Sequence, residues 1–462
     1  MTSRPRAVVV GVQLDGTTED EHLSSLDELT RLGETLGLEV IGRVTQRRPA
    51  LAKGSVVGLG KLRELAAWTG GTGIIPSPAP KAKPKAGPAL EDEVEEPDED
   101  EEPEDDTPLA PDLPEPIEAA TLVLVDHDLT PSQARNLEKA TDAEVMDRTA
   151  VILAIFHRHA RSREARLQVE IAELNYLIPR LRESTQQRSQ GRQRGGGRGS
   201  GQSAHELDKR NVRDRIAALR RELAEIEATS GERRKRRSTQ PTVALVGYTN
   251  AGKSSLMRRL TGSEVYVADK LFATLDTTIR ALVPETKPRV LVSDTVGFIK
   301  KLPHDLVASF RSTLDEARDA DLLLHVVDAS DPAFPGQLEV TLSVLGELDA
   351  LGAERWLILN KADRVDEGAR WVLEQRYPDG ILMSAHDPGD VASLHARIVR
   401  WLERDMHEHT MLVPYDRHAI VAELHDEVRI LAEEHVDDGT RVRFRATNEV
   451  AQRFEAKLAR RG

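Results

Sequence analysis

The chain has 462 residues, of which 39% are hydrophobic, so it fits roughly three or four domains and can form packed cores. It contains no cysteine, which excludes disulfides, thiolate metal sites and cysteine nucleophiles. The formal net charge of −14 mostly reflects one acidic run, Glu91 to Asp106, and therefore says little about partners.

Residues 1–160 are predicted to form an N-terminal α/β domain. Strand-like apolar runs at Ala7–Leu14 and Leu38–Val44 alternate with helical spacing at Leu23–Leu36 and at Leu62–Trp68. Thr121–Val125 then resumes with the pattern of a buried strand. The alternation of the two patterns favours a sheet covered by helices.

Residues 76–117 interrupt this domain with a change of composition. Lysines and prolines come first, then the acidic run, then further prolines. Such a segment cannot form a core, so we expect a disordered insertion. It is either a solvated spacer or a shield that keeps the basic loop of the next domain from binding stray RNA.

Two long helices are predicted within residues 161–237. Apolar residues recur at steps of three and four along each helix: Leu167, Ile171, Leu174, Ile178 and Leu181, then Val212, Ile216, Leu219, Leu223 and Ile226. This spacing favours an antiparallel helical hairpin, in which Pro179 should end or kink the first helix. The Gly- and Arg-rich loop at 187–205 is either a solvated flexible connector or a contact for RNA phosphates.

A phosphate-binding P-loop pattern follows the apolar strand Val243–Val246. Its eight residues match G-x-x-x-x-G-K-[ST] and precede a helical pattern: Gly247, Tyr248, Thr249, Asn250, Ala251, Gly252, Lys253 and Ser254. Backbone N–H groups and the helix N-terminus would surround the phosphates. Lys253 would reach the β- and γ-phosphates, and Ser254 would bind Mg²⁺. A chance glycine-rich turn is the disfavoured alternative.

Two further strand ends identify the base as guanine. Trp356–Leu359 is an apolar strand that leads into the guanine-reading pattern Asn360, Lys361, Ala362 and Asp363. Asp363 would accept hydrogen bonds from the ring N–H and the exocyclic amine, whereas adenine would leave this carboxylate unpaired. Ile381–Met383 ends in Ser384, Ala385 and His386, where a backbone N–H can meet the guanine carbonyl. The sequence therefore predicts a protein that binds GTP and GDP and hydrolyses GTP.

Two segments between these motifs are predicted to sense the γ-phosphate. Val290–Val292 leads to Asp294, Thr295, Val296 and Gly297. Asp294 would hold Mg²⁺ through a water and Gly297 would donate its N–H to the γ-phosphate, an ordinary turn being the alternative.

The other segment contains Phe272, Ala273, Thr274, Leu275 and Asp276. We expect Thr274 to complete the magnesium shell, although Thr277 or Thr278 would serve by chemistry alone. The predicted catalytic residues are thus Lys253, Thr274 and Gly297, and the predicted metal ligands are Ser254 and Thr274.

Phe298 follows Gly297, where many GTPases place a Gln that orients the attacking water. A phenyl ring cannot do this, so intrinsic turnover should be slow and a partner or a rearranged switch must complete the site. We hypothesise that Asn250 positions a monovalent cation, K⁺, between the phosphates. The alternative is that Asn250 only braces the loop.

The predicted fold class is multidomain α/β, with a doubly wound P-loop sheet in a GTPase domain at 238–404. A small α+β domain is expected at 410–462. Its predicted elements are the strands Met411–Pro414 and Arg441–Arg445 and the helices Ala419–Glu434 and Glu449–Leu458.

Together, these motifs resemble the HflX family of ribosome-associated P-loop GTPases. The likeness covers nearly everything outside Pro76–Pro116, and beyond the GTPase domain it includes four short runs: Asn136–Glu138, Asp147–Thr149, Leu167–Glu170 and Leu177–Leu181. Two departures stand out. Arg198–Ser203 replaces the family's Gly-Pro-Gly-Glu turn, and Thr277 replaces a usual proline.

The resemblance implies a GTPase that binds the large ribosomal subunit and its RNA. We expect a cytoplasmic monomer that does not bind DNA. In its GTP form such a protein splits stalled or idle ribosomes, with the loop at 187–205 facing ribosomal RNA. No apolar run reaches membrane-spanning length, so no stable insertion is expected, and peripheral membrane association is left open. The alternative is a GTP-dependent RNA- or protein-binding switch that does not split ribosomes.

Overall fold

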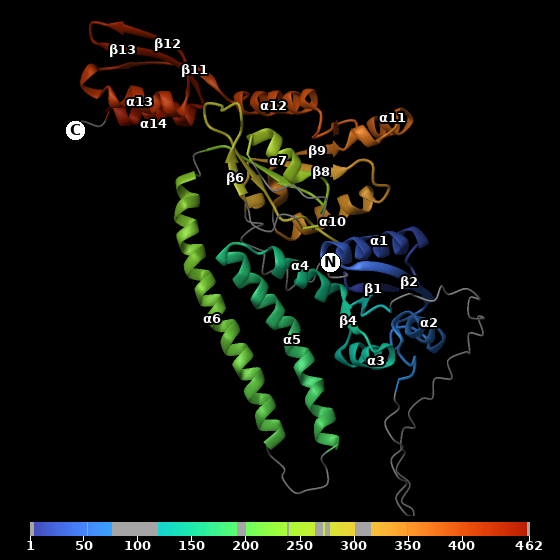
Figure 1. Ribbon diagram of the computed structural model, residues 1–462. Coiled ribbons are helices and arrows are strands. Elements are labelled where there is room, and N and C mark those ends of the chain that lie inside the picture. Colours follow the sequence, from blue (N-terminus) through green and yellow to red (C-terminus); the bar gives the residue numbers. More distant parts are fainter. Residues whose placement is uncertain are drawn as a thin grey trace, which may run out of the picture. The chain divides into compact units, whose positions relative to one another are not determined.

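The computed structural model describes residues 4–52, 54–75, 119–191, 200–237, 240–263, 271–272, 278–300, 316–348 and 350–459 (Figure 1). The predicted insertion at 76–117 lies outside these residues. The chain divides into two compact units, Met1–Ala154 with Ile178–His205, and Ile155–Leu177 with Glu206–Gly462.

The first unit is built on a four-stranded parallel sheet of order β2-β1-β3-β4. Its strands are β1 (Arg6–Leu14), β2 (Glu39–Arg48), β3 (Leu122–Val125) and β4 (Glu144–Asp147). Helix α1 (Glu19–Thr35) covers one face, and α2 (Leu59–Thr69) and α3 (Pro131–Thr141) cover the other (Figure 1). The predicted N-terminal strands and helices are confirmed, with ends that differ by a few residues.

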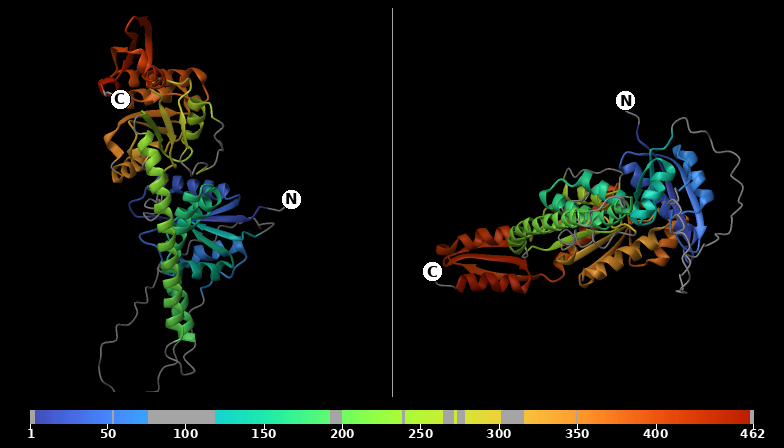
Figure 2. Two further views of the ribbon diagram at one scale, coloured as in Figure 1. Left: turned by 90° about the vertical axis from the view of Figure 1, so that its left-hand side faces the viewer. Right: turned by 90° about the horizontal axis from the view of Figure 1, so that it is seen from below.

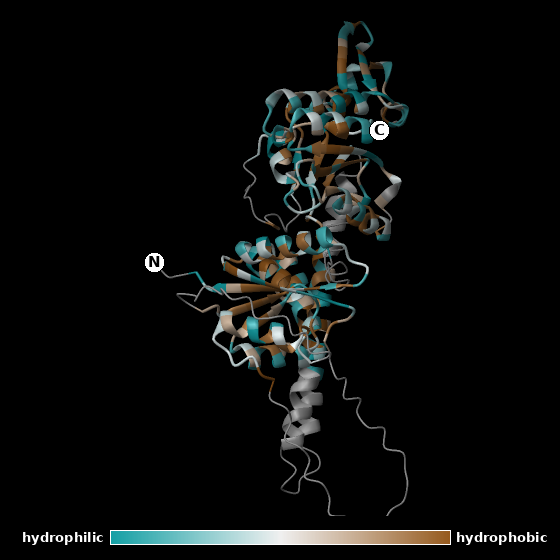
Figure 3. Cartoon of the chain, turned by 90° about the vertical axis from the view of Figure 1, so that its right-hand side faces the viewer, coloured by the Kyte–Doolittle hydropathy of each residue, from teal (hydrophilic) through white to brown (hydrophobic). Residues whose placement is uncertain are grey.

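Burial on both faces explains the sequence of β1. A parallel sheet covered by helices on both sides needs apolar residues at successive positions, and Ala7 to Val10 are fully buried. Val8 and Val10 join a cluster with Leu62 of α2 and Leu137 of α3. Figure 3 shows these apolar strands between helices whose outer surfaces are hydrophilic.

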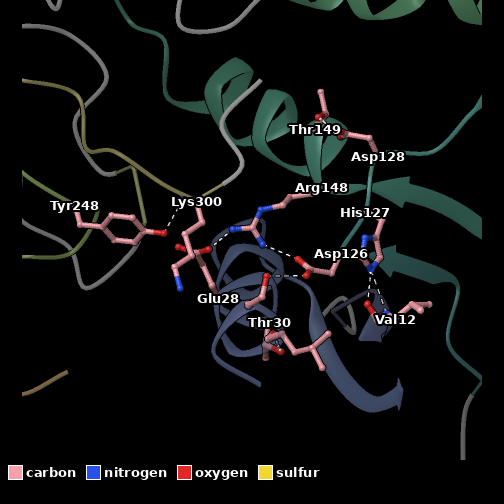
Figure 4. Close-up of polar contacts among 12 residues, drawn as sticks. Val12, Glu28, Thr30, Asp126, His127, Asp128, Arg148, Thr149, Tyr248 and Lys300 are labelled. Carbon is pink, nitrogen blue, oxygen red and sulfur yellow. Dashed lines mark hydrogen bonds and ion pairs between the residues drawn. The ribbon is translucent and has the colours of Figure 1, made fainter. Parts of the chain in front are cut away.

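A buried arginine joins the ends of this sheet to helix α4 (Arg148–His159). Arg148 is 1% exposed and its guanidinium donates to Asp126 Oδ1 at 2.7 Å and to Glu28 (Figure 4). Ser25 Oγ donates to the other oxygen of Asp126 at 2.6 Å. The charge is therefore paired on two sides, as burial of an arginine requires.

Two of the short runs that carry the family likeness meet in one ion pair. Arg180 donates to Asp147 Oδ2 at 2.5 Å and to the carbonyl oxygen of Leu129 at 3.2 Å. Asp147 lies at the end of β4, and Arg180 lies on α5 (Arg163–Gly191). This contact fastens the distal half of α5 to the parallel sheet.

Helices α5 and α6 (Ser200–Arg237) form the predicted hairpin (Figure 2). Arg163 pairs with Glu222, and Glu170 pairs with Arg215. Residue numbers therefore rise along α5 where those of its partners on α6 fall. The two helices are therefore antiparallel. Leu167, Ile171, Ile216 and Leu219 are buried, which confirms the apolar face expected from the spacing.

Two details of the hairpin differ from the prediction: where the first helix ends and how long the connecting loop is. Pro179 does not end α5, which continues to Gly191, because a proline removes one backbone N–H while the following turns bond normally. The predicted flexible loop at 187–205 is helical at 187–191 and 200–205, because extending a helix that is already formed costs far less than starting one. Residues 192–199 lie outside the described part of the chain.

The GTPase domain contains a six-stranded sheet of order β10-β9-β8-β5-β7-β6. The strands are β5 (Thr242–Val246), β6 (Thr278–Ala281), β7 (Leu291–Asp294), β8 (Leu322–Asp328), β9 (Glu354–Asn360) and β10 (Ile381–Leu382). All pairs are parallel except β6 with β7. The doubly wound sheet is confirmed, with an antiparallel strand added at one edge.

Helices pack on both faces of this sheet. Leu256 of α7 (Lys253–Thr261) and Ile398 of α12 (Pro388–Glu403) belong to one cluster with β5 and β8. Phe334 of α10 (Phe334–Glu347) and Leu373 of α11 (Glu367–Arg376) belong to another with Val327 and Leu359. Short 3₁₀ turns occur at Ala350–Gly352 and Ala362–Arg364. The carboxyl ends of the parallel strands thus remain free for loops, where ligands bind in such folds.

The C-terminal domain is a three-stranded antiparallel sheet of order β11-β13-β12, with two helices. Its elements are β11 (His407–Val413), a 3₁₀ turn (Tyr415–Arg417), α13 (Ala419–Glu427), β12 (Arg429–Val436), β13 (Gly439–Ala446) and α14 (Asn448–Ala459). The predicted helix Ala419–Glu434 was too long, because residues from Arg429 onward pair with β13 instead.

No helix in the described ranges is both long enough and apolar enough to cross a membrane.

Candidate guanine-nucleotide site

The P-loop joins β5 to α7 through backbone conformations that favour glycine. Gly247 has φ +145° and Gly252 has φ +97°. A Cβ on Gly247 would lie 2.1 Å from the carbonyl oxygen of Val326, and one on Gly252 would lie 2.2 Å from Asn360 Nδ2. Both glycines are therefore required by close approach to neighbouring strand ends, as the phosphate-binding motif demands.

Lys253 opens α7 and is only 6% exposed. Its Nζ donates to the carbonyl oxygens of Gly247 at 2.9 Å and Tyr248 at 2.7 Å. Burial lowers the pKa of Lys253 to about 8, partly opposed by the nearby charge of Asp294. The ammonium group is thus held inside the loop that is predicted to surround the phosphates.

Ser254 and Asp294 meet at the start of α7. Ser254 Oγ donates to Asp294 Oδ2 at 2.8 Å, and Asp294 is fully buried at the end of β7. A hydroxyl and a carboxylate are oxygen donors of the kind that Mg²⁺ prefers. The two predicted magnesium-binding groups, one on α7 and one at the end of β7, are therefore adjacent and chemically suited to the ion. Thr274, the other predicted ligand, lies outside the described residues, as do Ala273, Leu275 and Asp276.

The segment that is predicted to sense the γ-phosphate lies against the P-loop. A Cβ on Gly297 would lie 2.9 Å from Thr249 Cα and 3.0 Å from Lys253 Nζ. Thr295 Oγ1 donates to the carbonyl oxygen of Leu245 at 2.8 Å, and Val296 is buried. Phe298 is 2% exposed, so its ring is packed in the protein interior, as expected for a residue that does not orient water.

Phe272 is the described residue of the other predicted switch segment. It adopts φ +57°, which is uncommon for an aromatic residue, and it is 3% exposed. Its ring meets Phe156 of α4 edge-on, with centroids 4.6 Å apart and an interplanar angle of 83°. This aromatic pair joins the start of the switch segment to the helix that leads into the hairpin.

The carboxylate of Asp363, which is predicted to read guanine, is positioned by a serine from the next strand end. Ser384 Oγ donates to Asp363 Oδ1 at 2.6 Å. This hydrogen bond, the largest cause, holds the pKa of Asp363 below its usual value, so the carboxylate is ionised at neutral pH. Ser384 in turn is held by Asp390 of α12, whose Oδ2 accepts from the Ser384 backbone N–H at 2.8 Å.

Asn360 ties three predicted motifs together. Its Nδ2 donates to the carbonyl oxygen of Ala251 in the P-loop at 2.8 Å, and its Oδ1 accepts from the N–H of Ala385 at 2.9 Å. The N–H of Ala362 donates to the carbonyl oxygen of Met383 at 3.1 Å, while His386 is exposed beside this turn. The P-loop and both guanine motifs therefore converge on one edge of the sheet, as the sequence predicted.

Lys361 has a partner that sequence reasoning missed. It adopts φ +62° and its Nζ donates to Asp328 Oδ2 at 2.6 Å. Asp328 ends β8, a buried strand of Leu and Val residues that also contains His325. A buried apolar run ending in an acidic residue was the signal available for finding it. Asp390 gave no such signal, because only the fold brings it to Ser384.

Models of three protein families match successive parts of the chain. "GTP-binding GTPase N-terminal" matches residues 23–74 and 113–157, and "GTP-binding GTPase Middle Region" matches residues 159–237. "50S ribosome-binding GTPase" matches residues 242–361, which include the P-loop and Asn360.

Relatives with the name GTPase HflX match almost the whole chain. One from Gluconacetobacter diazotrophicus is 51% identical over 99% of this chain and 98% of its own length. Another, from Caldanaerobacter subterraneus subsp. tengcongensis, is 36% identical over 98% of this chain and 93% of its own length. A crystal structure of an SsGBP and GDP complex is 20% identical, covers 86% of this chain and 98% of that chain, and has a TM-score of 0.44.

Proposed function

Because the chain belongs to the HflX family of P-loop GTPases, and so binds GTP and GDP and hydrolyses GTP, we propose that it binds the large ribosomal subunit and splits stalled or idle ribosomes in its GTP form. The observation that carries the proposal is likeness along the whole chain, hairpin included. The description "50S ribosome-binding GTPase" supports the large subunit as the partner. The splitting activity is inferred from the resemblance to the HflX family.

We assign the ribosomal contact to the distal end of the α5–α6 hairpin. Both helices are long and end in the Arg-rich segment at 187–205. Arginine can position phosphates without reading sequence, and such binding weakens as salt rises. The alternative, a solvated connector, predicts no salt-dependent RNA contact from this segment.

We propose that the Phe156–Phe272 contact couples the bound nucleotide, GTP or GDP, to the position of the hairpin. Ordering of the switch segment around GTP would fix Phe272, whose ring packs against α4, and α4 is followed directly by α5. Two buried aromatic rings in edge-on contact do not move independently. The GTP and GDP states would thus present different hairpin positions to the ribosome.

For hydrolysis, we propose in-line attack of a water on the γ-phosphorus, with cleavage of its bond to the β-phosphate oxygen. Lys253 would stabilise charge on the β- and γ-phosphates, and the N–H of Gly297 would bind a γ-oxygen. Mg²⁺, held by Ser254 and Thr274 and through a water by Asp294, would supply positive charge at the phosphates. Because Phe298 cannot orient water, the large subunit would complete the site.

A role for K⁺ is a separate proposal. Asn250 stands in the P-loop with φ +59°, within reach of the phosphate-binding backbone. A monovalent cation held there would add positive charge between the phosphates, as an arginine finger does in other GTPases. Turnover in K⁺ should exceed turnover in Na⁺ at matched ionic strength, and identical rates would leave Asn250 as a brace.

Sedimentation of ribosomes through a sucrose gradient tests the proposed function. With the wild-type chain and a slowly hydrolysed GTP analogue, intact ribosomes should separate into subunits, whereas GDP should leave them intact. Lys253→Ala should be inactive because it cannot hold the nucleotide. Intact ribosomes in every lane, together with normal GTP hydrolysis, would favour a GTP-dependent switch that acts on another RNA or protein.

Two matched variants test whether the distal end of the hairpin binds the large subunit. One variant replaces Arg188, Arg192, Arg194 and Arg198 of the distal segment with glutamine. The control replaces Arg210, Arg213, Arg220 and Arg221, which are exposed along α6, with glutamine. The distal variant should bind the large subunit more weakly and with a shallower salt dependence than the control. Equal affinities would assign the distal segment to a connector.

A further inference from the structure

Tyr248 makes a hydrogen bond that phosphate binding does not require. Its side chain is 4% exposed, and its hydroxyl oxygen accepts from the backbone N–H of Lys300 at 2.6 Å (Figure 4). The P-loop motif uses the backbone at this position and leaves the side chain unspecified. A large polar side chain buried here therefore needs a separate explanation.

The hydroxyl extends a short ladder between the P-loop and the segment that follows Asp294. The N–H of Thr249 donates to the carbonyl oxygen of Phe298 at 2.8 Å. The N–H of Phe298 donates to the carbonyl oxygen of Gly247 at 3.2 Å, so Tyr248 and Phe298 form a parallel bridge. With the Tyr248–Lys300 bond, residues 297–300 are held at three points along the P-loop.

This ladder fixes the backbone on the C-terminal side of the γ-phosphate-sensing glycine, and on its N-terminal side Thr295 Oγ1 donates to the carbonyl oxygen of Leu245 at 2.8 Å. Gly297 precedes the bridged residue, and a Cβ placed on it would lie 3.0 Å from Lys253 Nζ. The Gly297 N–H lies in the peptide plane before this glycine, next to the plane that the Phe298 N–H holds, so the ladder limits how far this donor can turn. A donor held in place before reaction stabilises the developing charge better than one that must reorganise.

We infer that Tyr248 is a positioning residue for GTP hydrolysis, whose hydroxyl holds the segment 297–300 so that the Gly297 N–H faces the γ-phosphate. The inference rests on the proposed role of Gly297. The side chain that holds the segment comes from the P-loop itself.

A role limited to ring packing makes a different prediction. Phenylalanine keeps the ring and its burial but leaves the N–H of Lys300 without the hydroxyl. If only packing mattered, Tyr248→Phe would behave like the wild type. If the hydroxyl positions the sensor, the loss appears in steps that involve the γ-phosphate and is absent from GDP binding.

The test compares Tyr248→Phe with Tyr415→Phe, a matched removal of one hydroxyl that donates to the carbonyl oxygen of Val436 in the C-terminal domain. Single-turnover hydrolysis and nucleotide affinities are measured without ribosomes, so failure of the ribosomal proposal cannot affect the result. Tyr248→Phe should lower the hydrolysis rate roughly tenfold and keep the Kd for GDP within about twofold. Its preference for a slowly hydrolysed GTP analogue over GDP should also shrink, while Tyr415→Phe matches the wild type.

Two outcomes would overturn the inference. One is a Tyr248→Phe rate equal to that of Tyr415→Phe. The other is an equal loss of GDP and GTP-analogue affinity, which would indicate a damaged P-loop. Gly297→Ala tests separately whether Gly297 acts at the γ-phosphate, because its added Cβ would crowd Thr249 and Lys253 Nζ. If Gly297→Ala hydrolyses GTP normally, the role of Gly297 fails. If it is impaired while Tyr248→Phe is not, only the role of the hydroxyl fails.

Discussion

The low pKa of Lys253 makes nucleotide affinity depend on pH in a predictable direction. In the free protein, burial lowers the pKa of Lys253 from 10.5 to about 8. Phosphate oxygens favour the charged ammonium, so binding should return the pKa to at least its ordinary value. Nucleotide binding therefore takes up a proton, and affinity falls as pH rises through the pKa of the free protein.

The size of the effect follows from these two pKa values. If only protonated Lys253 binds GDP, the Kd should rise roughly tenfold between pH 7 and pH 9, which is about 1.4 kcal/mol. At pH 8 about half of the free protein carries the proton, so binding should take up roughly half a proton. Calorimetric titration with GDP in buffers of different ionisation enthalpy measures both quantities.

Lys253→Arg is the matched control, because its guanidinium stays charged throughout this range. Its affinity for GDP should be weaker overall but nearly independent of pH. Ionisation of the guanine ring at alkaline pH affects both proteins equally and cancels in the comparison. A wild-type profile as flat as that of Lys253→Arg, with no proton uptake at pH 8, would refute the reasoning.

Three further changes have defined outcomes. Asp363→Asn should raise the Kd for GDP by roughly 30- to 100-fold while leaving the Kd for ADP unchanged, because it removes the acceptor for the guanine N–H groups. An unchanged ratio of the Kd for GDP to the Kd for ADP would contradict the role of Asp363 in guanine binding. Ser384→Ala should raise the Kd for GDP by roughly three- to tenfold, because Asp363 loses the hydroxyl that holds it; wild-type affinity would argue against that support. Arg148→Met should lower the free energy of unfolding of the N-terminal unit by about 3–5 kcal/mol in urea denaturation, because Asp126 and Glu28 lose their buried partner. Nucleotide affinity should not change, and an unaltered unfolding transition would show that the cluster contributes no net stability.

Where the motifs lie in the fold could be predicted from the sequence, because each motif follows an apolar strand. Asn360 shows why this works: it ends β9, and parallel strands deliver their carboxyl ends to one edge. The side chains that hold the motifs in place could not be predicted in this way. Asp390 approaches Ser384 only through the packing of α12, and the Tyr248–Lys300 bond depends on how the two segments lie together.

The errors in secondary structure have a physical cause in the tertiary fold. Residues 429–434 include good helix formers, so local propensity led to a predicted helix, Ala419–Glu434, that is longer than the observed α13. A hairpin overrides that propensity, since β12 pairs with β13 across a turn that ends at Gly439 with φ +154°. A Cβ at Gly439 would lie 2.3 Å from the carbonyl oxygen of Val413. The Asp437-Asp438-Gly439 run was the available turn signal.

The central claim is that the large ribosomal subunit governs GTP turnover at this site. Phosphate release from GTP, measured while purified large subunits are added, tests it directly. The rate should rise and saturate with the wild-type chain and stay at background with Lys253→Ala. A wild-type rate that is the same at every concentration of large subunits would contradict the claim.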